Sequence, residues 1–191
     1  MKKLVFVTGN KAKAGDVQRI LDFPIEIIEL DLEEIQELDL EKVALHKVSA
    51  AFERVKTPVI IDDVGFYVHA WNNFPGPLIK WLLKAGDGSA SLMLKMLEGV
   101  SQRGATAKLV VAYHDGNKVH FFSGEVKGTI ADTIRAGNNF GFGWDSIFIP
   151  EGFDKTFGEM TFEEKNEISH RRKAFDKFKE YLNSQNLKKE I

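Results

Sequence analysis

The chain has 191 residues, of which 43% are hydrophobic and 28% are charged, and its formal net charge is -2. These values are typical of a globular protein and exclude a disordered or collagen-like chain. The near-neutral charge also argues against broad non-specific binding of nucleic acid, which needs a basic surface. The length predicts one domain, spanning residues 1–191, that can divide into two lobes.

The sequence contains no cysteine, which excludes a disulfide scaffold, a thiolate zinc site and a cysteine nucleophile. No apolar stretch approaches the roughly 20 residues that are needed to span a bilayer. Lys2 and Lys3 precede an apolar run at 4–7 that is too short for the core of a signal peptide. We therefore expect a soluble, cytoplasmic protein with no membrane partner.

Apolar patterning predicts alternating strands and helices in the first part of the chain. The expected elements are a strand at 4–7, a helix at 11–21, a strand at 25–32, a helix at 40–55 and a strand at 59–61 that ends in Asp62 and Asp63. Pro77 suits the first turn of a helix that runs to Lys84.

Further helices and hairpins are expected in the second part of the chain. A helix is predicted at 89–97, a β-hairpin joins 109–113 to 119–122 around Asp115-Gly116, and another strand covers 125–130. Thr161 and Glu164 fit a capping box for a terminal helix to 182, in which Ser169 can cap a restart. Alternating elements followed by hairpins predict an α/β fold with a mixed sheet.

The segment from Thr8 to Lys13 has features of a phosphate-binding loop. A strand ends there, small polar residues form a turn, and a helix begins whose first amides and positive dipole end can meet an anion. It is not a P-loop, because Gly15 is followed by Asp16 rather than by Lys and Ser or Thr. The alternative interpretation is a capped helix with solvated lysines.

Acidic residues mark a second candidate site. Because side chains alternate along a strand, one of Asp62 and Asp63 should face a cleft while the other braces the loop. Acids at the end of a strand often serve Mg²⁺ chemistry, although a solvated turn pair is an equal alternative. Lys47, at the edge of the apolar stripe of helix 40–55, either lies along the surface or points into a cleft, and the surface placement is the favoured interpretation from this pattern alone.

The histidines show no zinc-binding spacing, and no Gly-x-Ser-x-Gly motif supports a serine hydrolase. Phe142 and Trp144, beside Gly143, can stack a base, but core filling is the favoured interpretation from this pattern alone. Likewise, His170 by itself is more often a structural donor than a ligand contact.

Several segments, in this order, resemble one family. They are Thr8-Gly9-Asn10-Lys11-x-Lys13, Asp62-Asp63-x-Gly65, Pro75-Gly76-Pro77, Phe142-Gly143-Trp144-Asp145, Glu164-Lys165-Asn166 and Ser169-His170-Arg171. The sequence looks like the inosine/xanthosine triphosphate pyrophosphatases, the Ham1 family of non-canonical purine nucleoside triphosphate pyrophosphatases. The likeness extends from Leu4 to about Leu182.

The resemblance implies a long, bent mixed sheet flanked by helices, two lobes with a central cleft, and a homodimer. It implies Mg²⁺-dependent hydrolysis of ITP, dITP and XTP to the monophosphate and pyrophosphate, which removes deaminated purines from the nucleotide pool. A purine nucleoside triphosphate is then the partner, rather than a nucleic acid. One departure is Val64, where many members carry Ser or Thr.

The resemblance also assigns roles to individual residues. Thr8, Asn10 and Lys13 correspond to the phosphate-binding loop, and Lys47 to a catalytic lysine near the phosphates. Asp63 corresponds to the acid that binds metal and activates water, and Glu34, with Glu37 as the alternative, to the first metal ligand. The base pocket corresponds to Phe142, Trp144, Asp145, Lys165, His170 and Arg171.

Other functions remain open at this stage. One is a pyrophosphatase for modified pyrimidine or methylated nucleotides. Another is a non-enzymatic nucleotide- or RNA-binding module, although Asp62 and Asp63 would repel phosphates unless a metal intervenes. A third is a P-loop ATPase, which would release orthophosphate from ATP or GTP.

Overall fold

The computed structural model describes residues 4–9, 11–21, 24–137 and 143–185. The chain divides into two compact units. Unit 1 comprises Met1–Asp63, Leu109–Gly124 and Arg171–Ile191, and unit 2 comprises Val64–Lys108 and Glu125–His170. The expected cleft between two lobes stays a prediction.

The described strands form a seven-stranded sheet in the order β2-β1-β3-β5-β6-β7, with β4 paired to β3. The strands are β1 (Val5–Val7), β2 (Glu26–Ile28), β3 (Val59–Val68), β4 (Pro75–Gly76), β5 (Gly104–His114), β6 (Val119–Ile130) and β7 (Phe148–Pro150). β1 runs parallel to β2 and β3, whereas the β3–β4 and β6–β7 pairs are antiparallel. The predicted α/β class with a mixed sheet is therefore confirmed.

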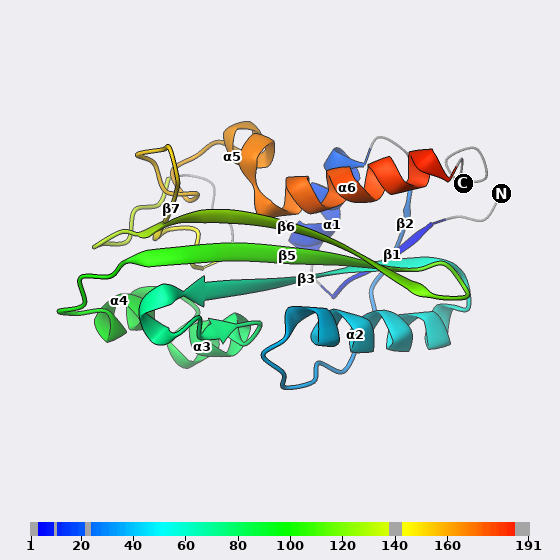
Figure 1. The fold of residues 1–191 in the computed structure, drawn as a ribbon, viewed down its shortest axis with the longest axis horizontal. Coiled ribbons are helices and arrows are strands. Elements are labelled where there is room, and N and C mark those ends of the chain that lie inside the picture. Colours follow the sequence, from blue (N-terminus) through cyan, green and yellow to red (C-terminus); the bar gives the residue numbers. More distant parts are fainter. Residues whose placement is uncertain (1–3, 10, 22–23, 138–142, 186–191) are drawn as a thin grey trace. The chain divides into compact units, whose positions relative to one another are not determined.

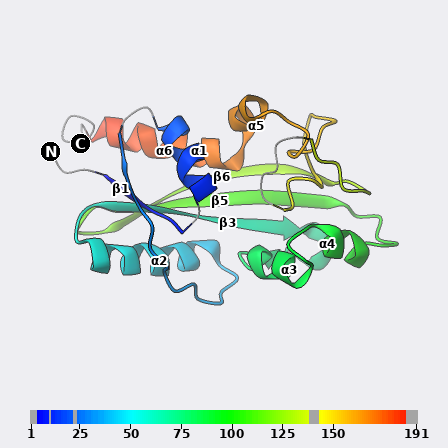
Figure 2. The same cartoon turned by 180° about the vertical axis from the view of Figure 1, so that it is seen from behind.

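The helices are α1 (Lys11–Ile20), α2 (Leu40–Val55), α3 (Ile79–Ala85), α4 (Ser91–Met96), α5 (Phe162–Ile168) and α6 (His170–Ser184), with a short 3-10 helix η1 (His69–Trp71). Within unit 1, α2 covers one face of the strands and α1 and α6 cover the other, as both side views show (Figure 1, Figure 2). Across the described residues, no helix has the length and apolar character needed to cross a membrane.

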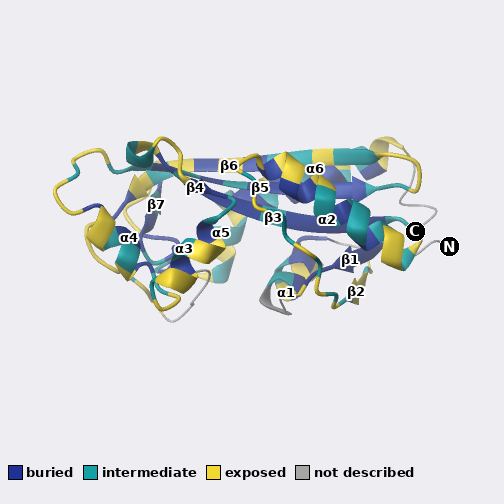
Figure 3. Cartoon of the chain, turned by 90° about the horizontal axis from the view of Figure 1, so that it is seen from below, coloured by how far each residue is buried: buried dark blue, intermediate teal, exposed yellow. Residues whose placement is uncertain are grey.

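Apolar side chains alternate between the two faces of the strands in unit 1, so a hydrophobic core forms on each face. Toward α2, a buried cluster joins strand residues to one stripe of the helix, and its members are Val5, Val7, Val59, Ile61, Val110, Ala112, Leu40, Ala44, Val48 and Ala51. Toward α6, Phe6 meets Phe175 edge to face, with ring centroids 6.4 Å apart. Figure 3 shows the strands β1 and β3 as largely buried, which agrees with packing on both faces.

The sequence predicted α2 at its observed bounds because local signals and packing agree there. Asp39 accepts hydrogen bonds from the amides of Glu41 and Lys42 at the N-terminus, and Lys56 ends the helix in the left-handed conformation, at φ 58°. The capping box of Thr161 and Glu164 at α5 is likewise confirmed.

Other expected boundaries were wrong. β3 does not end at the two acids but continues to Val68, and the strands of the β5–β6 hairpin are much longer than expected. The second strand is shorter than the predicted 25–32, because only Glu26–Ile28 pairs with β1. Pro77 lies in the turn before α3, which begins at Ile79.

Candidate active site

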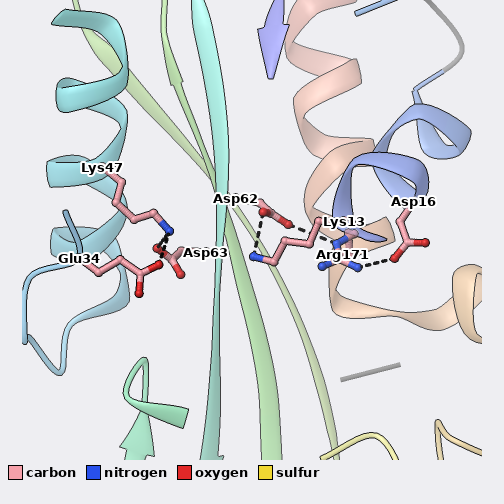
Figure 4. Close-up of polar contacts among 7 residues, drawn as sticks. All are labelled: Lys13, Asp16, Glu34, Lys47, Asp62, Asp63 and Arg171. Atoms are coloured by element: carbon pink, nitrogen blue, oxygen red, sulfur yellow. Dashed lines mark hydrogen bonds and ion pairs between the residues drawn. The ribbon is translucent and has the colours of Figure 1, made fainter. Parts of the chain in front are cut away.

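Asp62 and Asp63 lie within β3 and point to opposite faces of the strand. Asp63 continues the row of Val59 and Ile61, which packs toward α2, whereas Asp62 continues the row of Ile60 toward α1 and α6. Figure 4 shows the result, with one charged cluster on each side of the strand. The expectation that the two acids diverge is confirmed, although neither belongs to a loop.

The first cluster, here called the α2-face cluster, joins Glu34, Lys47 and Asp63. The Lys47 ammonium lies 2.9 Å from Asp63 Oδ2 and 3.2 Å from Glu34 Oε1. The side chain of Lys47 is 13% exposed, so it points inward rather than along the surface. Burial lowers the pKa of Lys47, but the carboxylates of Asp63 and Glu34 outweigh burial and raise this pKa above its usual value.

The geometry distinguishes Glu34 from Glu37. Glu37 accepts hydrogen bonds from the amides of Leu38 and Asp39 and forms an exposed ion pair with Lys42. The carboxylate of Glu37 therefore caps the backbone just before α2. The carboxylate of Glu34 instead contacts the Lys47 ammonium, which Asp63 also contacts.

The second cluster, here called the Asp62 cluster, joins residues that are remote in the sequence. Asp62 Oδ1 lies 3.0 Å from the Lys13 ammonium, and Asp62 Oδ2 lies 3.3 Å from Nε of Arg171. Arg171 also donates to Asp16 at 2.8 Å. Burial raises the pKa of Asp62, but Lys13 and Arg171 outweigh burial and hold this pKa below its usual value.

The predicted phosphate loop lies at the carboxyl end of β1. Thr8 is buried, and its amide donates to the Ile28 carbonyl at 3.2 Å, which ties the loop to β2. α1 begins at Lys11, and Lys13 lies in its first turn. Asn10 lies outside the described residues.

The described residues expected to form a base pocket, apart from Arg171, lie in unit 2. Lys165 forms an ion pair with the buried Asp145 at 2.5 Å, and its ammonium lies 5.3 Å from the centre of the Phe157 ring. His170 is buried between the rings of Trp144 and Phe157, at centroid distances of 5.5 and 6.2 Å. Phe142 lies outside the described residues.

Trp144 is fully buried and stacks on Phe66 with ring centroids 4.7 Å apart. This is the core-filling placement that the sequence pattern alone favoured. Arg171, in contrast, belongs to unit 1, where its ion pairs are made with Asp16 and Asp62. The base-binding roles of these residues stay predictions.

Sequence reasoning missed Asp16 and Phe157. Asp16 lies three residues after Lys13 in α1, and this spacing places both side chains on one face of the helix. That signal was available in the sequence. No local pattern pointed to Phe157, because its contacts with Lys165 and His170 are tertiary.

The carboxylates of the α2-face cluster are the residues that could hold a divalent cation. Carboxylates of Glu34 and Asp63 approach the same ammonium, and Mg²⁺ usually takes one or two carboxylates together with substrate oxygens and waters. Over the described part of the chain, no group of three or more His, Cys, Asp and Glu side chains could hold a metal ion. The α2-face cluster offers two carboxylates, which is within the number that Mg²⁺ usually takes from a protein.

The sequence and the fold of this chain both match a known protein family. The model of the Ham1 family matches residues 4–181. The chain belongs to the Ham1 family. A Ham1 protein of Coxiella burnetii shares its fold at a TM-score of 0.83 and 27% identity, over 96% of this chain and 100% of that one.

Relatives in the Ham1 family are more similar in sequence. The dITP/XTP pyrophosphatase of Saccharolobus solfataricus is 42% identical, over 95% of this chain and 94% of that protein. The inosine triphosphate pyrophosphatase of Candida glabrata is 41% identical, over 94% of this chain and 97% of that protein. The family resemblance stated from the motifs is thus confirmed.

Proposed function

We propose that this protein hydrolyses non-canonical purine nucleoside triphosphates, namely ITP, dITP and XTP, to the monophosphate and pyrophosphate. Relatives about 40% identical over nearly the whole chain are named for this activity. The observation that carries the proposal is the pair of charged clusters at Asp62 and Asp63. Each cluster contains a lysine, so two cations for phosphate groups lie beside neighbouring residues of β3.

The charge of the α2-face cluster supports a role for Mg²⁺. One ammonium and two carboxylates give a net charge of −1, which repels a triphosphate that carries about four negative charges at neutral pH. A divalent cation held by Glu34 and Asp63 changes the sign of the cluster to +1. When bound, Mg²⁺ would neutralise phosphate charge and lower the pKa of a coordinated water.

Asp63 is the proposed general base. It accepts a proton from a water whose oxygen forms a bond to the α-phosphorus, while the bond from that phosphorus to the bridging oxygen breaks and pyrophosphate leaves. The Lys47 ammonium forms an ion pair with Asp63 at 2.9 Å, so it holds this carboxylate in place. Lys13 offers positive charge to the phosphates from the other face of β3.

Selectivity for the base is proposed to rest on hydrogen-bond donors. Hypoxanthine and xanthine present an oxygen at position 6, whereas adenine presents an amino group. Lys165, His170 and Arg171 can donate to the oxygen, but an amino group would leave the donors of the buried His170 and Arg171 unsatisfied.

The proposal is tested by incubating the protein with ITP, XTP, dITP, ATP and GTP, with and without Mg²⁺, and identifying the products. We expect pyrophosphate from the first three substrates, only with Mg²⁺, and a loss of at least about 100-fold in kcat for Asp63→Asn. Orthophosphate as the product would indicate an ATPase instead. Preference for dUTP or dTTP would indicate a pyrimidine enzyme, and binding without turnover a binding module.

We also propose that the protein is a homodimer, as its motifs implied. Light scattering coupled to size exclusion measures the molar mass directly. A mass of one chain across the working concentration range would refute this part of the proposal.

A further inference from the structure

The Asp62 carboxylate connects helices that are far apart in the sequence. Its Oδ1 binds Lys13 of α1 at 3.0 Å, 49 residues away, and its Oδ2 binds Arg171 of α6 at 3.3 Å, 109 residues away. The side chain of Asp62 is 1% exposed. Figure 4 shows its contacts with Lys13 and Arg171. A single buried acid thus holds two cations, one through each oxygen.

A buried carboxylate is costly to a fold unless its partners are well placed, and an apolar residue at the same position is often as stable or more stable. Arg171 has a second carboxylate, because it also donates to Asp16 at 2.8 Å. The guanidinium is therefore held from two sides, and it fixes Asp62 with Oδ1 toward Lys13. An ammonium has three N–H donors, so Lys13 can bind Asp62 and phosphate oxygens together.

We propose that Asp62 is a positioning residue, which holds Lys13 and Arg171 in one arrangement before the substrate binds; this rests on the function proposed above. A lysine side chain loses considerable conformational freedom when it is immobilised. Asp62 restricts Lys13 in advance, so that less freedom is lost on binding and the affinity for the triphosphate rises. Asp62 therefore acts on binding through Lys13, whereas Asp63 acts on the chemical step.

The test is a double-mutant cycle on the affinity for ITP, measured by calorimetry without divalent metal. Asp62→Asn keeps the size of the side chain and removes its charge, and we expect the Kd to rise about tenfold. In the Lys13→Ala background the same substitution should change the Kd less than about twofold, because the residue through which Asp62 acts is gone. A merely structural role would not produce this coupling.

Asp176→Asn is the matched control. Asp176 forms a partly exposed ion pair with Arg172 in α6, and its substitution should leave the Kd unchanged. In steady-state assays with Mg²⁺, Asp62→Asn should raise KM about tenfold and lower kcat less than threefold. This pattern is expected because a residue that acts on binding weakens the ground state and the transition state by the same factor. Circular dichroism checks the fold of each variant.

A Kd of Asp62→Asn within twofold of wild type, or an equal rise in both backgrounds, would overturn the inference. If Asp62→Asn does not fold, Asp62→Glu takes its place in both backgrounds, because it keeps the charge and displaces the carboxylate from Lys13 and Arg171. A rise in Kd that disappears in the Lys13→Ala background supports the inference, and an equal Kd change in both backgrounds overturns it. If the wild-type protein releases pyrophosphate from ITP but Asp62→Asn changes the Kd equally in both backgrounds, only the role of Asp62 is refuted. If the effect of Asp62→Asn on the Kd depends on Lys13 but the wild-type protein releases no pyrophosphate, only the proposed function is refuted.

Discussion

Replacing Lys47 by alanine tests the α2-face cluster without relying on turnover. The substitution removes the ammonium that Glu34 and Asp63 share and leaves two carboxylates facing each other. Alanine favours a helix slightly more than lysine does, so the helix itself is not weakened. Any loss of stability therefore reports the ion pairs together with the packing of the largely buried Lys47 stem.

The expected loss follows from the exposure of the partners. Removing one partner of a fully buried ion pair costs about 3–5 kcal/mol. Glu34 and Asp63 keep 29% and 14% exposure, so water relieves part of the repulsion and the loss should be about 2 kcal/mol. For a chain of this length, that corresponds to a fall in Tm of about 4–8 °C.

The effect should depend on pH with a definite sign. Because the pKa of Lys47 is raised in the folded protein, its stabilising contribution is complete below the ordinary value of 10.5 and disappears as the pH rises through the higher folded pKa.

Thermal unfolding of wild type, Lys47→Ala and Lys42→Ala, each with and without Mg²⁺, supplies the measurement. Lys42 is the control in the same helix, and it forms only an exposed pair with Glu37, so its removal should have little effect. Mg²⁺ should raise the Tm of Lys47→Ala more than that of wild type, because the cluster then carries two uncompensated carboxylates. Equal Tm values for both lysine variants, or an equal response to Mg²⁺, would refute the reasoning.

Glu34→Gln should lower Mg²⁺-dependent turnover at least about tenfold, whereas Glu37→Gln should stay near wild type; the opposite ranking in a metal titration would exchange their roles. Arg171→Ala should weaken the hydrolysis of every triphosphate, because the ion pair with Asp62 is lost, and it should lower ITP hydrolysis further than any residual ATP hydrolysis. Equal losses on ITP and ATP would argue against a role in base selection. Because the pKa of Asp62 is lowered in the folded protein, its charge stabilises the fold above the ordinary value of 3.8, and this contribution is lost as the pH falls through the lower folded pKa. The urea unfolding midpoints of wild type and Asp62→Asn should therefore converge as the pH is lowered below 3.8.

Elements with local signals were predictable from the sequence. The helix from Leu40 to Val55 has an apolar stripe, an aspartate at its start and a clear end, and all three agree with its packing on the strands. The capping box at Thr161 was predictable for a similar reason, because its hydrogen bonds join residues within one helical turn.

Elements that depend on distant partners were not predictable. Asp62 and Asp63 look like a turn after an apolar strand, yet Lys13 and Lys47 compensate their charges and the strand continues. The motif order identified Asp63, Lys13 and Lys47 as site residues, but it gave Asp62 no role and did not show which acid holds which lysine. That pairing joins residues 49 positions apart in the case of Lys13, so no local period records it.

The placement of both acids inside a regular strand explains how neighbouring residues can have separate tasks. Side chains at consecutive strand positions leave opposite faces, so Asp62 and Asp63 cannot exchange partners without a shift in the register of β3. At the end of a strand, where the backbone is free to turn, no such constraint would hold. The continuation of β3 to Val68 therefore keeps the proposed general base Asp63 with Glu34 and Lys47, while the same stretch of strand keeps Asp62 with Lys13 and Arg171.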